Sequence, residues 1–586
     1  MAMAQERNTD FGIIYDLTDT TALEDSSPST TDNKSFADIT LLSEETPFDN
    51  MITLEHNHSI LDGTLAEFPD SPSDIVFFSR ELSDENGEFS SNPTITVEFD
   101  EPHSSYALTL SFVDEHPLEV KVSWLNGTDT LYYDYFTITS NVFIVQKDIE
   151  LYDKLIFEFT KALPSRYVKL YDIKYGVLLN WDETDVRRAS MVNELNVVMD
   201  KLSINTVTVE IADAKDDTNF GNNLGMHRYF QRHQPMLPYE WYNDTQIYLG
   251  KYYLSKFSNE NNSGKLIGQS TIGLLDEIQF NDGEVYNGEL AGTVLASIFS
   301  AADIEDYEID AVTANQELYG TLKPQTCRNA LKEVLFACHS IIDTTAGTVV
   351  ISKPNIEIAS TIKRSEKFST KATKTEYVSG VEIKYTEYEV QEEATEILST
   401  QYSAGTYTVV FNTPYTNVVV TSDSLVDSDS NYYYATFTLS ADDDVTITGT
   451  PYSTITKSVI AKVDYIDPGE KENIKTYTSQ LCSEESALAL ANELLQYYIK
   501  YRLKLNIKYL ASDIEINSMR QVENYTAEYN NYIAHYTKRN YDLSGGFIDN
   551  AELMGYFDSQ DYLVYAGEGL VWSVGENSVE WDGTLI

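Results

Sequence analysis

The sequence predicts a multidomain, mainly β protein with a few helices. Its 586 residues correspond to about four domains, because a chain of this length exceeds one compact core and a domain usually has roughly 150 residues. A hydrophobic fraction of 42% with 12% aromatic residues is enough to build folded cores. The 42 tyrosines and 24 phenylalanines, together with runs of threonine and valine, favour strands over helices.

Residues 41–178 show the pattern of a β-sandwich. Apolar and polar residues alternate in segments that recur about every dozen residues, as strands with one buried face require. These segments are residues 94–99, 107–112, 120–124 and 154–159. A turn sequence, Asn126-Gly127, lies between two of them. Residues 1–40 are rich in threonine, serine and aspartate without sustained periodicity, which predicts an arm that is disordered or becomes ordered on a neighbour.

After residue 178 the strands are interrupted by three helices. Apolar residues at helical spacing predict helices at 287–301 and 326–340. A third helix is expected at 483–500, because Ser483 is a good N-cap and is followed by two glutamates in the first turn. Further strands are expected on either side of these helices.

The chain is strongly acidic. It has 40 lysines and arginines against 93 aspartates and glutamates, a formal net charge of 40 − 93 = −53. This charge argues against nucleic-acid binding and against binding to an anionic membrane surface, because both partners carry phosphates. No stretch approaches about 18 consecutive apolar residues, so we expect no membrane span. Residues 1–11 lack the basic and apolar regions of a signal peptide.

The three cysteines are too few, and of the wrong parity, for a disulfide framework. Cys327 and Cys338 would lie about 16 Å apart on one helix, which is too far for a disulfide bond. A reducing compartment during folding is the simplest inference.

The residue patterns of known active sites are missing, so we predict that the protein is not an enzyme and has no cofactor. There is no HExxH, GxSxG, P-loop or GxGxxG sequence. His56 and His58 would face the same side of a strand, but no third metal ligand is evident and a surface loop is the better interpretation. The acidic runs at 423–429 and 442–444 are consistent with structural Ca²⁺, although solvated turns explain them more simply.

One group of aromatic residues is a candidate for sugar contact. It lies in the predicted sandwich and consists of Trp124, Tyr132, Tyr133 and Tyr135, with Phe136 beside them. Aromatic rings stack on sugar rings, but at strand spacing they more often belong to a core.

Two blocks of sequence resemble the tail hub proteins of bacteriophages and phage-like particles of Gram-positive bacteria. The first block contains ILDGTLAEFP (60–69), SRELSDENGEF (79–89), FDEPHSS (99–105) and RYVKLYDIKYG (166–176). The second contains LSINT (202–206), LGKYYLSK (249–256), TIGLLD (271–276), LYGTL (318–322), TCRNAL (326–331), VVISKP (349–354) and YDLSGGFIDNAE (541–552). The resemblance spans roughly residues 55–555.

The resemblance implies a jelly roll followed by a hub fold with tandem tube-like β-barrels. On this basis we expect an arm (1–40), a jelly-roll accessory domain (41–178), a first barrel (179–270) and a helix and strand domain (271–375). A second barrel or β-rich insertion (376–480), a helix with closing hub strands (481–556) and a tail (557–586) complete the chain.

In function, the resemblance implies a structural protein of the virion, assembled in the host cytoplasm. It would form a homotrimeric hub at the tail tip or baseplate that caps or continues the tail tube during host attachment and DNA delivery. Its partners would be the tail tube or distal tail protein ring, the tape-measure protein, and peripheral baseplate or receptor-binding proteins. Trimers with two similar barrels per subunit match a six-fold tube.

Two other functions remain as alternatives. The first is a carbohydrate-binding adhesin of the tail tip, in which residues 41–178 hold the receptor. The second is a secreted glycoside hydrolase, which the missing signal peptide and the five tryptophans disfavour.

Overall fold

The computed structural model describes residues 10–35, 37–42, 55, 76–113, 115–212, 218–242, 245–260, 263–281, 283–345, 347–510, 516–526, 530–544 and 548–558, and three strands within 563–580. Strands account for 54% of the chain and helices for 13%. The predicted mainly β, multidomain fold is therefore confirmed. Among the described residues, no helix is both long and apolar enough to cross a membrane.

The domain near the N-terminus is a sandwich of two antiparallel sheets. One sheet has the strand order β2-β4-β9-β6-β7 and the other β3-β10-β5-β8. From β3 to β10 this is the strand order of a jelly roll, in which two Greek keys surround one core. Aromatic and aliphatic side chains from both sheets form that core. The strands are β2 (Ser26–Ser29), β3 (Phe77–Phe78), β4 (Thr94–Ser105), β5 (Leu108–Phe112), β6 (Glu119–Asn126), β7 (Asp129–Thr137), β8 (Val142–Val145), β9 (Ile149–Lys161) and β10 (Lys169–Lys174).

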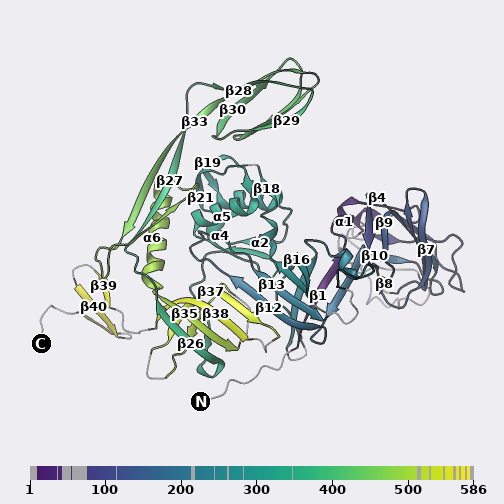
Figure 1. Ribbon diagram of the computed structural model, residues 1–586, viewed down its shortest axis with the longest axis horizontal. Helices are drawn as coiled ribbons and strands as arrows, with labels where there is room; N and C mark the ends of the chain where they lie inside the picture. Colours follow the sequence, from purple (N-terminus) through teal and green to yellow (C-terminus); the bar gives the residue numbers. More distant parts are fainter. Residues whose placement is uncertain are drawn as a thin grey trace.

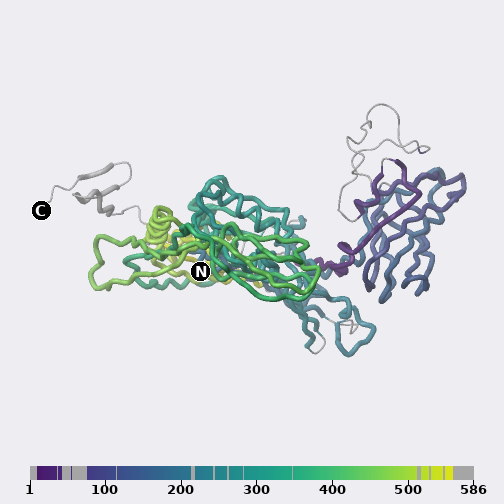
Figure 2. The backbone as a smooth tube through the Cα atoms, turned by 90° about the horizontal axis from the view of Figure 1, so that it is seen from above, coloured from purple at the N-terminus to yellow at the C-terminus, as the bar shows by residue number. Residues whose placement is uncertain are grey.

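The jelly roll is inserted between two neighbouring strands of another sheet. β1 (Asp10–Thr18) pairs antiparallel with β11 (Gly176–Trp181), and Thr18 lies opposite Gly176. Just beyond this pair, the Asp19 amide donates to the Tyr175 carbonyl at 3.1 Å. Figure 2 shows that the jelly roll lies apart from the rest of the chain. The β1–β11 pair lies where the two parts join.

This arrangement differs from the expected arm and domain boundary. Residues 10–18 form a strand within their own chain, because Ile13, Tyr15 and Leu17 supply the buried face of a strand. β11 begins before the expected boundary at residue 178 and belongs to the same sheet. The 60–69 sequence lies outside the described residues.

The largest element is one continuous sheet of 14 strands, with the order β11-β1-β14-β16-β17-β13-β12-β37-β38-β35-β26 and three strands off this path. Its two halves meet where β12 pairs with β37. The expected first barrel (179–270) lies within the first half of one open sheet, whose path ends at β11 and β26. Residues 376–480, expected as a second barrel or β-rich insertion, form separate smaller sheets, and the second half of the large sheet is built from residues 358–374 and 503–557 instead. Besides β1 and β11, the strands of the first half are β12 (Val186–Glu194), β13 (Thr206–Ala212), β14 (Pro235–Tyr242), β15 (Thr245–Tyr248), β16 (Tyr252–Glu260) and β17 (Ser263–Gln269). Those of the second are β25 (Ile358–Ile362), β26 (Lys367–Lys374), β35 (Leu503–Leu510), β36 (Met519–Val522), β37 (Tyr532–Asp542) and β38 (Ile548–Phe557).

A layer of helices and short strands covers the sheet and shares a core with its second half (Figure 1). All three expected long helices are present, and the Ser483 side chain caps the last by accepting from the Ser486 amide. The helices are α2 (Thr271–Leu274), α3 (Ala291–Ala301), α4 (Ala311–Ala314), α5 (Cys327–Cys338) and α6 (Glu484–Lys500). The short strands are β18 (Gln279–Phe280), β19 (Val285–Leu290), β20 (Tyr307–Ile309), β21 (Glu317–Thr321), β22 (Gln325–Thr326), β23 (Ile341–Asp343) and β24 (Val349–Ser352).

A long two-stranded arm carries a small β module at its tip (Figure 1). The arm is formed by β27 (Gly380–Val390) and β33 (Asp443–Lys462), with α6 packed along both strands. The module has its own apolar core, and its Tyr433 hydroxyl lies 2.8 Å from the Thr321 hydroxyl of β21. The remaining strands are β28 (Thr395–Tyr402), β29 (Gly405–Val410), β30 (Tyr415–Thr421), β31 (Leu425–Ser430), β32 (Tyr434–Leu439), β34 (Ile474–Thr478), and β39 (Leu563–Ala566), β40 (Gly569–Val574) and β41 (Asn577–Glu580) near the C-terminus.

Candidate functional site

The junction of the two sheet halves has a polar face on which charges are paired. Glu194 of β12 forms an ion pair with Lys538 of β37 across the junction. Lys504 of β35 pairs with Glu552 of β38 at 2.7 Å. Because β12 is next to β37, residues from the first and the last third of the chain form one surface. This surface is the candidate site for assembly.

A buried network on the other face of the sheet supports the junction. Arg539 and Asp549 are both fully buried, and their charged groups lie 2.7 Å apart. The Tyr509 hydroxyl donates to Asp549 at 3.0 Å and accepts from Arg539 at 2.9 Å. Burial alone would lower the pKa of Arg539, yet the neighbouring tyrosines and Asp549 hold it well above its usual value. The arginine therefore stays charged inside the sheet.

The predicted sugar-contact residues do not form one group. Trp124 is fully buried in the jelly-roll core, with Tyr132 and Phe136 packed against that core. The Trp124 side chain points from β6 inward between the two sheets. It therefore offers no surface to a ligand. Tyr133 and Tyr135 of β7 point outward and are 56% and 53% exposed.

The two exposed tyrosines lie beside a row of polar side chains. Lys121 of β6 lies directly across from Tyr135, and its Nζ is 5.7 Å from the Tyr133 ring centroid. The same ammonium group is 3.1 Å from the Glu158 carboxylate. A hydrogen bond from Asn92 and the ion pair with Lys121 lower the pKa of Glu158. Burial raises this pKa, but by less than the two contacts together lower it. This outer sheet face combines exposed rings with fixed hydrogen-bonding groups.

The two acidic runs that were candidates for Ca²⁺ lie in the tip module, where Asp427 and Asp429 are exposed on β31 and Asp443 begins β33. Asp443 accepts from the Ser422 hydroxyl at 2.6 Å and from the Ser424 amide at 2.8 Å. These hydrogen bonds lower the pKa of Asp443 to about 2. Asp442 accepts from the Ala404 amide. Among the described residues, no group of three or more histidine, cysteine or acidic side chains is placed to hold a metal ion. His56 and His58 lie outside the described residues.

All three cysteines are buried and free. Burial raises the pKa of Cys338 to about 12 and also raises the pKa of Cys327 and Cys482. A thiol must lose its proton to act as a nucleophile, so these side chains belong to the core of the helical layer.

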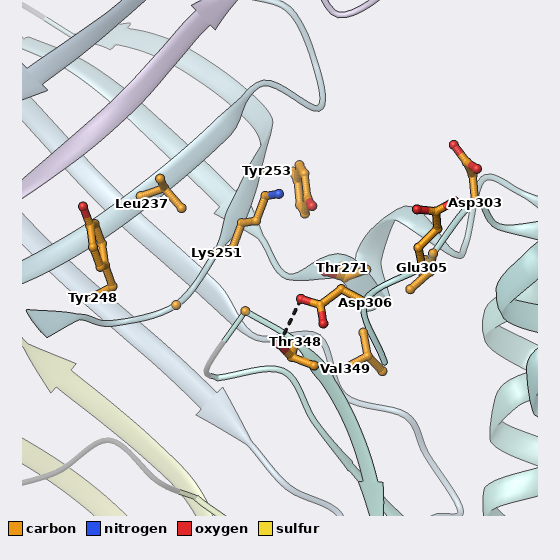
Figure 3. Close-up of a pocket in the computed structure, with 13 residues that line it drawn as sticks. Leu237, Tyr248, Lys251, Tyr253, Thr271, Asp303, Glu305, Asp306, Thr348 and Val349 are labelled. Atoms are coloured by element: carbon orange, nitrogen blue, oxygen red, sulfur yellow. Dashed lines mark hydrogen bonds between the residues drawn. The ribbon is translucent and has the colours of Figure 1, made fainter. Parts of the chain in front are cut away.

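An open pocket of about 470 Å³ lies between the first half of the sheet and the helical layer. Figure 3 shows Lys251 and Tyr253 on one side and Asp303 and Glu305 on the other. Asp306 accepts a hydrogen bond from the Thr348 hydroxyl at 2.9 Å. The residues that line this pocket include three carboxylates and one lysine but no histidine, serine or cysteine.

Sequence reasoning missed the Arg539 network and the paired junction. Arg539 and Asp549 stand ten positions apart on β37 and β38, which follow one another in the chain. The available signal was a charged residue at an inward-facing position of each strand, since a buried charge requires a partner. The partner of Glu194 had no such signal, because the paired residue lies 344 positions away.

No family model and no curated protein matches the chain. Solved structures do match. The 43 kDa tail protein of prophage MuSo2 from Shewanella oneidensis is 10% identical, with 63% of this chain and 93% of that one covered and a TM-score of 0.37. The tail protein from Neisseria meningitidis MC58 is 9% identical, with coverage of 64% and 92% and a TM-score of 0.40. Prophage tail protein gp18 from Listeria monocytogenes EGD-e is 7% identical, with coverage of 65% and 92% and a TM-score of 0.37. The chain is thus structurally similar to phage tail proteins.

Proposed function

We propose that the protein is the trimeric hub of a phage or phage-like tail tip or baseplate. In this role it caps or continues the tail tube and anchors peripheral tip proteins during host attachment and DNA delivery. The observation that carries the proposal is the single open sheet of 14 strands. Two joined halves in each subunit provide six sheet halves in a trimer, which matches the six-fold symmetry of a tube.

The two inserted modules support a role as a mounting platform. The jelly roll extends from the β1–β11 pair and the tip module from the β27–β33 arm (Figure 1). Each module has its own core, so each presents a surface without interrupting the sheet. Such surfaces suit contacts with peripheral baseplate or receptor-binding proteins, whereas the sheet suits contact with the tail tube or distal tail protein ring and with the tape-measure protein.

We expect the purified protein, or the protein on its particle, to be a homotrimer. Sedimentation or native mass measurement over a range of concentrations tests this, together with a reconstruction of the particle. A monomer in both settings would refute the proposal.

Removing the jelly roll is expected to leave the trimer intact. Residues 20–174 should be replaced by Asn-Gly, because Asp19 and Tyr175 already form a hydrogen-bonded pair that a two-residue hairpin turn can close. The deletion leaves β11 in place, so the sheet keeps every strand. The readouts are the mass of the truncated protein and its retention of peripheral tip proteins, which should weaken. Loss of the trimer would show that the jelly roll is part of the ring rather than an accessory to it.

A second candidate function is sugar binding by the jelly roll. The exposed Tyr133 and Tyr135 rings beside the Lys121–Glu158 pair favour it, because rings and charged groups of this kind bind saccharides by stacking and hydrogen bonding. Binding of the intact protein to purified host-wall polysaccharide tests this function. Loss of binding in a Tyr133→Ala, Tyr135→Ala variant that remains folded is the expected result.

A further inference from the structure

The two ends of the large sheet are edge strands with different surroundings. β26 is the last strand of the main path at one end of the sheet, and β11 is the last strand at the other end. In Figure 1, β26 lies at the left of the sheet, whereas β1, the strand that pairs with β11, lies toward the right. An edge strand has a row of backbone donors and acceptors without a neighbouring strand.

The hydrophobic core that buries side chains of β35 does not cover the neighbouring strand β26. Thr370 and Ala372 lie opposite Ile507 and Leu505 of β35. The two β35 side chains are buried, but both β26 residues are exposed. Phe368 is also 50% exposed. Seven of the eight β26 residues are exposed, so this strand is open to solvent on both faces as well as along its edge.

The same strand is basic in a chain with a net charge of −53. Lys371 and Lys374 form no ion pair with any described residue. Lys508 of β35 is exposed and lies opposite Ser369, on the face that Lys371 shares. This end of the sheet is therefore positively charged.

The opposite end is acidic. Asp182 and Glu183 directly follow β11, and Asp10 is the first residue of β1. Since Ile13 lies opposite Trp181, all three carboxylates gather at one end of the strand pair. The nearby Asp10 charge raises the pKa of Glu183, and no described lysine or arginine pairs with these groups. Leu178 in the middle of β11 is 48% exposed.

We propose that β26 of one copy docks along β11 of the next copy. The lysines of β26 then lie near Asp10, Asp182 and Glu183 of the neighbour, and the two edges pair by backbone hydrogen bonds. Two different surfaces meet in this contact, so it is head-to-tail, and such contacts form a ring when the rotation closes. Opposite charges select the correct edge and reject pairing of like edges. This inference rests on the proposed function, because it identifies the surfaces that close the trimer.

Edge lysines also have a simpler explanation. Many sheets carry lysine on an edge strand to prevent pairing with other chains. The two explanations differ in what happens when the charge is reversed. A protective lysine can be replaced by glutamate without changing the oligomer, whereas a docking lysine cannot.

The test is a charge exchange in the full-length chain. The first variant carries Lys371→Glu and Lys374→Glu, the second carries Asp182→Lys and Glu183→Lys, and the third combines all four changes. Lys323→Glu, at another exposed lysine, is the control. Oligomeric mass is measured over a concentration series at low and high salt, and circular dichroism and melting confirm the fold.

The first two variants should each raise the concentration at which half of the trimer dissociates, on the order of tenfold or more. The combined variant and the control should be trimers like the unmodified chain. If the first two variants remain trimers, or if the combined variant does not recover, the pairing of β26 with β11 is wrong while the hub function stands. An unmodified chain that is monomeric at every concentration and on the particle overturns both proposals.

Discussion

Replacing Asp549 by alanine is expected to lower the free energy of unfolding of the sheet by about 3–5 kcal/mol. The change leaves Arg539 charged and fully buried without its carboxylate, which lies 2.7 Å away in the unmodified protein. Taking an arginine out of water without a counter-ion is far more costly than losing one hydrogen bond. The loss in the free energy of unfolding is measured by denaturant unfolding, and hydrogen exchange of the β35–β38 amides shows whether the loss lies in this part of the sheet.

A matched control is Glu552→Ala. Glu552 pairs with Lys504 at 2.7 Å on the same part of the sheet, but both side chains are well exposed, so its loss should cost less than about 1 kcal/mol. A variant with Arg539→Met and Asp549→Leu removes both charges and should recover most of the lost stability. Equal effects of Asp549→Ala and Glu552→Ala would contradict the assignment of a buried ion pair.

Replacing Trp124 by alanine is expected to destabilise the jelly roll by about 3–5 kcal/mol. The side chain is fully buried, its ring centroid lies 6.0 Å from that of Tyr132, and its removal leaves a large cavity between the two sheets. Thermal unfolding of the jelly roll, monitored by tryptophan-independent probes such as hydrogen exchange of β6 and β9, is the measurement.

Tyr133→Ala is the control for Trp124→Ala, because Tyr133 is on the adjacent strand but is 56% exposed. It should change stability by no more than about 0.5 kcal/mol. The pair of variants also separates packing from ligand binding. If Trp124→Ala leaves the jelly roll as stable as before, then Trp124 does not belong to the core. Sugar binding by this variant would then be the next measurement.

The sequence determined the local elements of this protein. Alternation of apolar and polar residues was enough to predict the strands of the jelly roll, since the buried face of a strand is visible in the spacing of its own residues. Helical spacing and the Ser483 cap placed α3, α5 and α6 for the same reason. The mainly β fold class and the acidic net charge followed from composition.

The tertiary structure alone decided how these elements combine. Pairing between strands depends on backbone hydrogen bonds, which carry no residue identity, so nothing in residues 10–18 indicated that they pair with both β11 and β14. Burial of Trp124 and exposure of Tyr133 were likewise undecided, because neighbouring aromatic residues on a strand point to opposite faces and only the position of the second sheet determines which face is inside. The open edges at β11 and β26 exist only once all strands between them are ordered, which is why the contact proposed between copies emerges from the structure and not from the sequence.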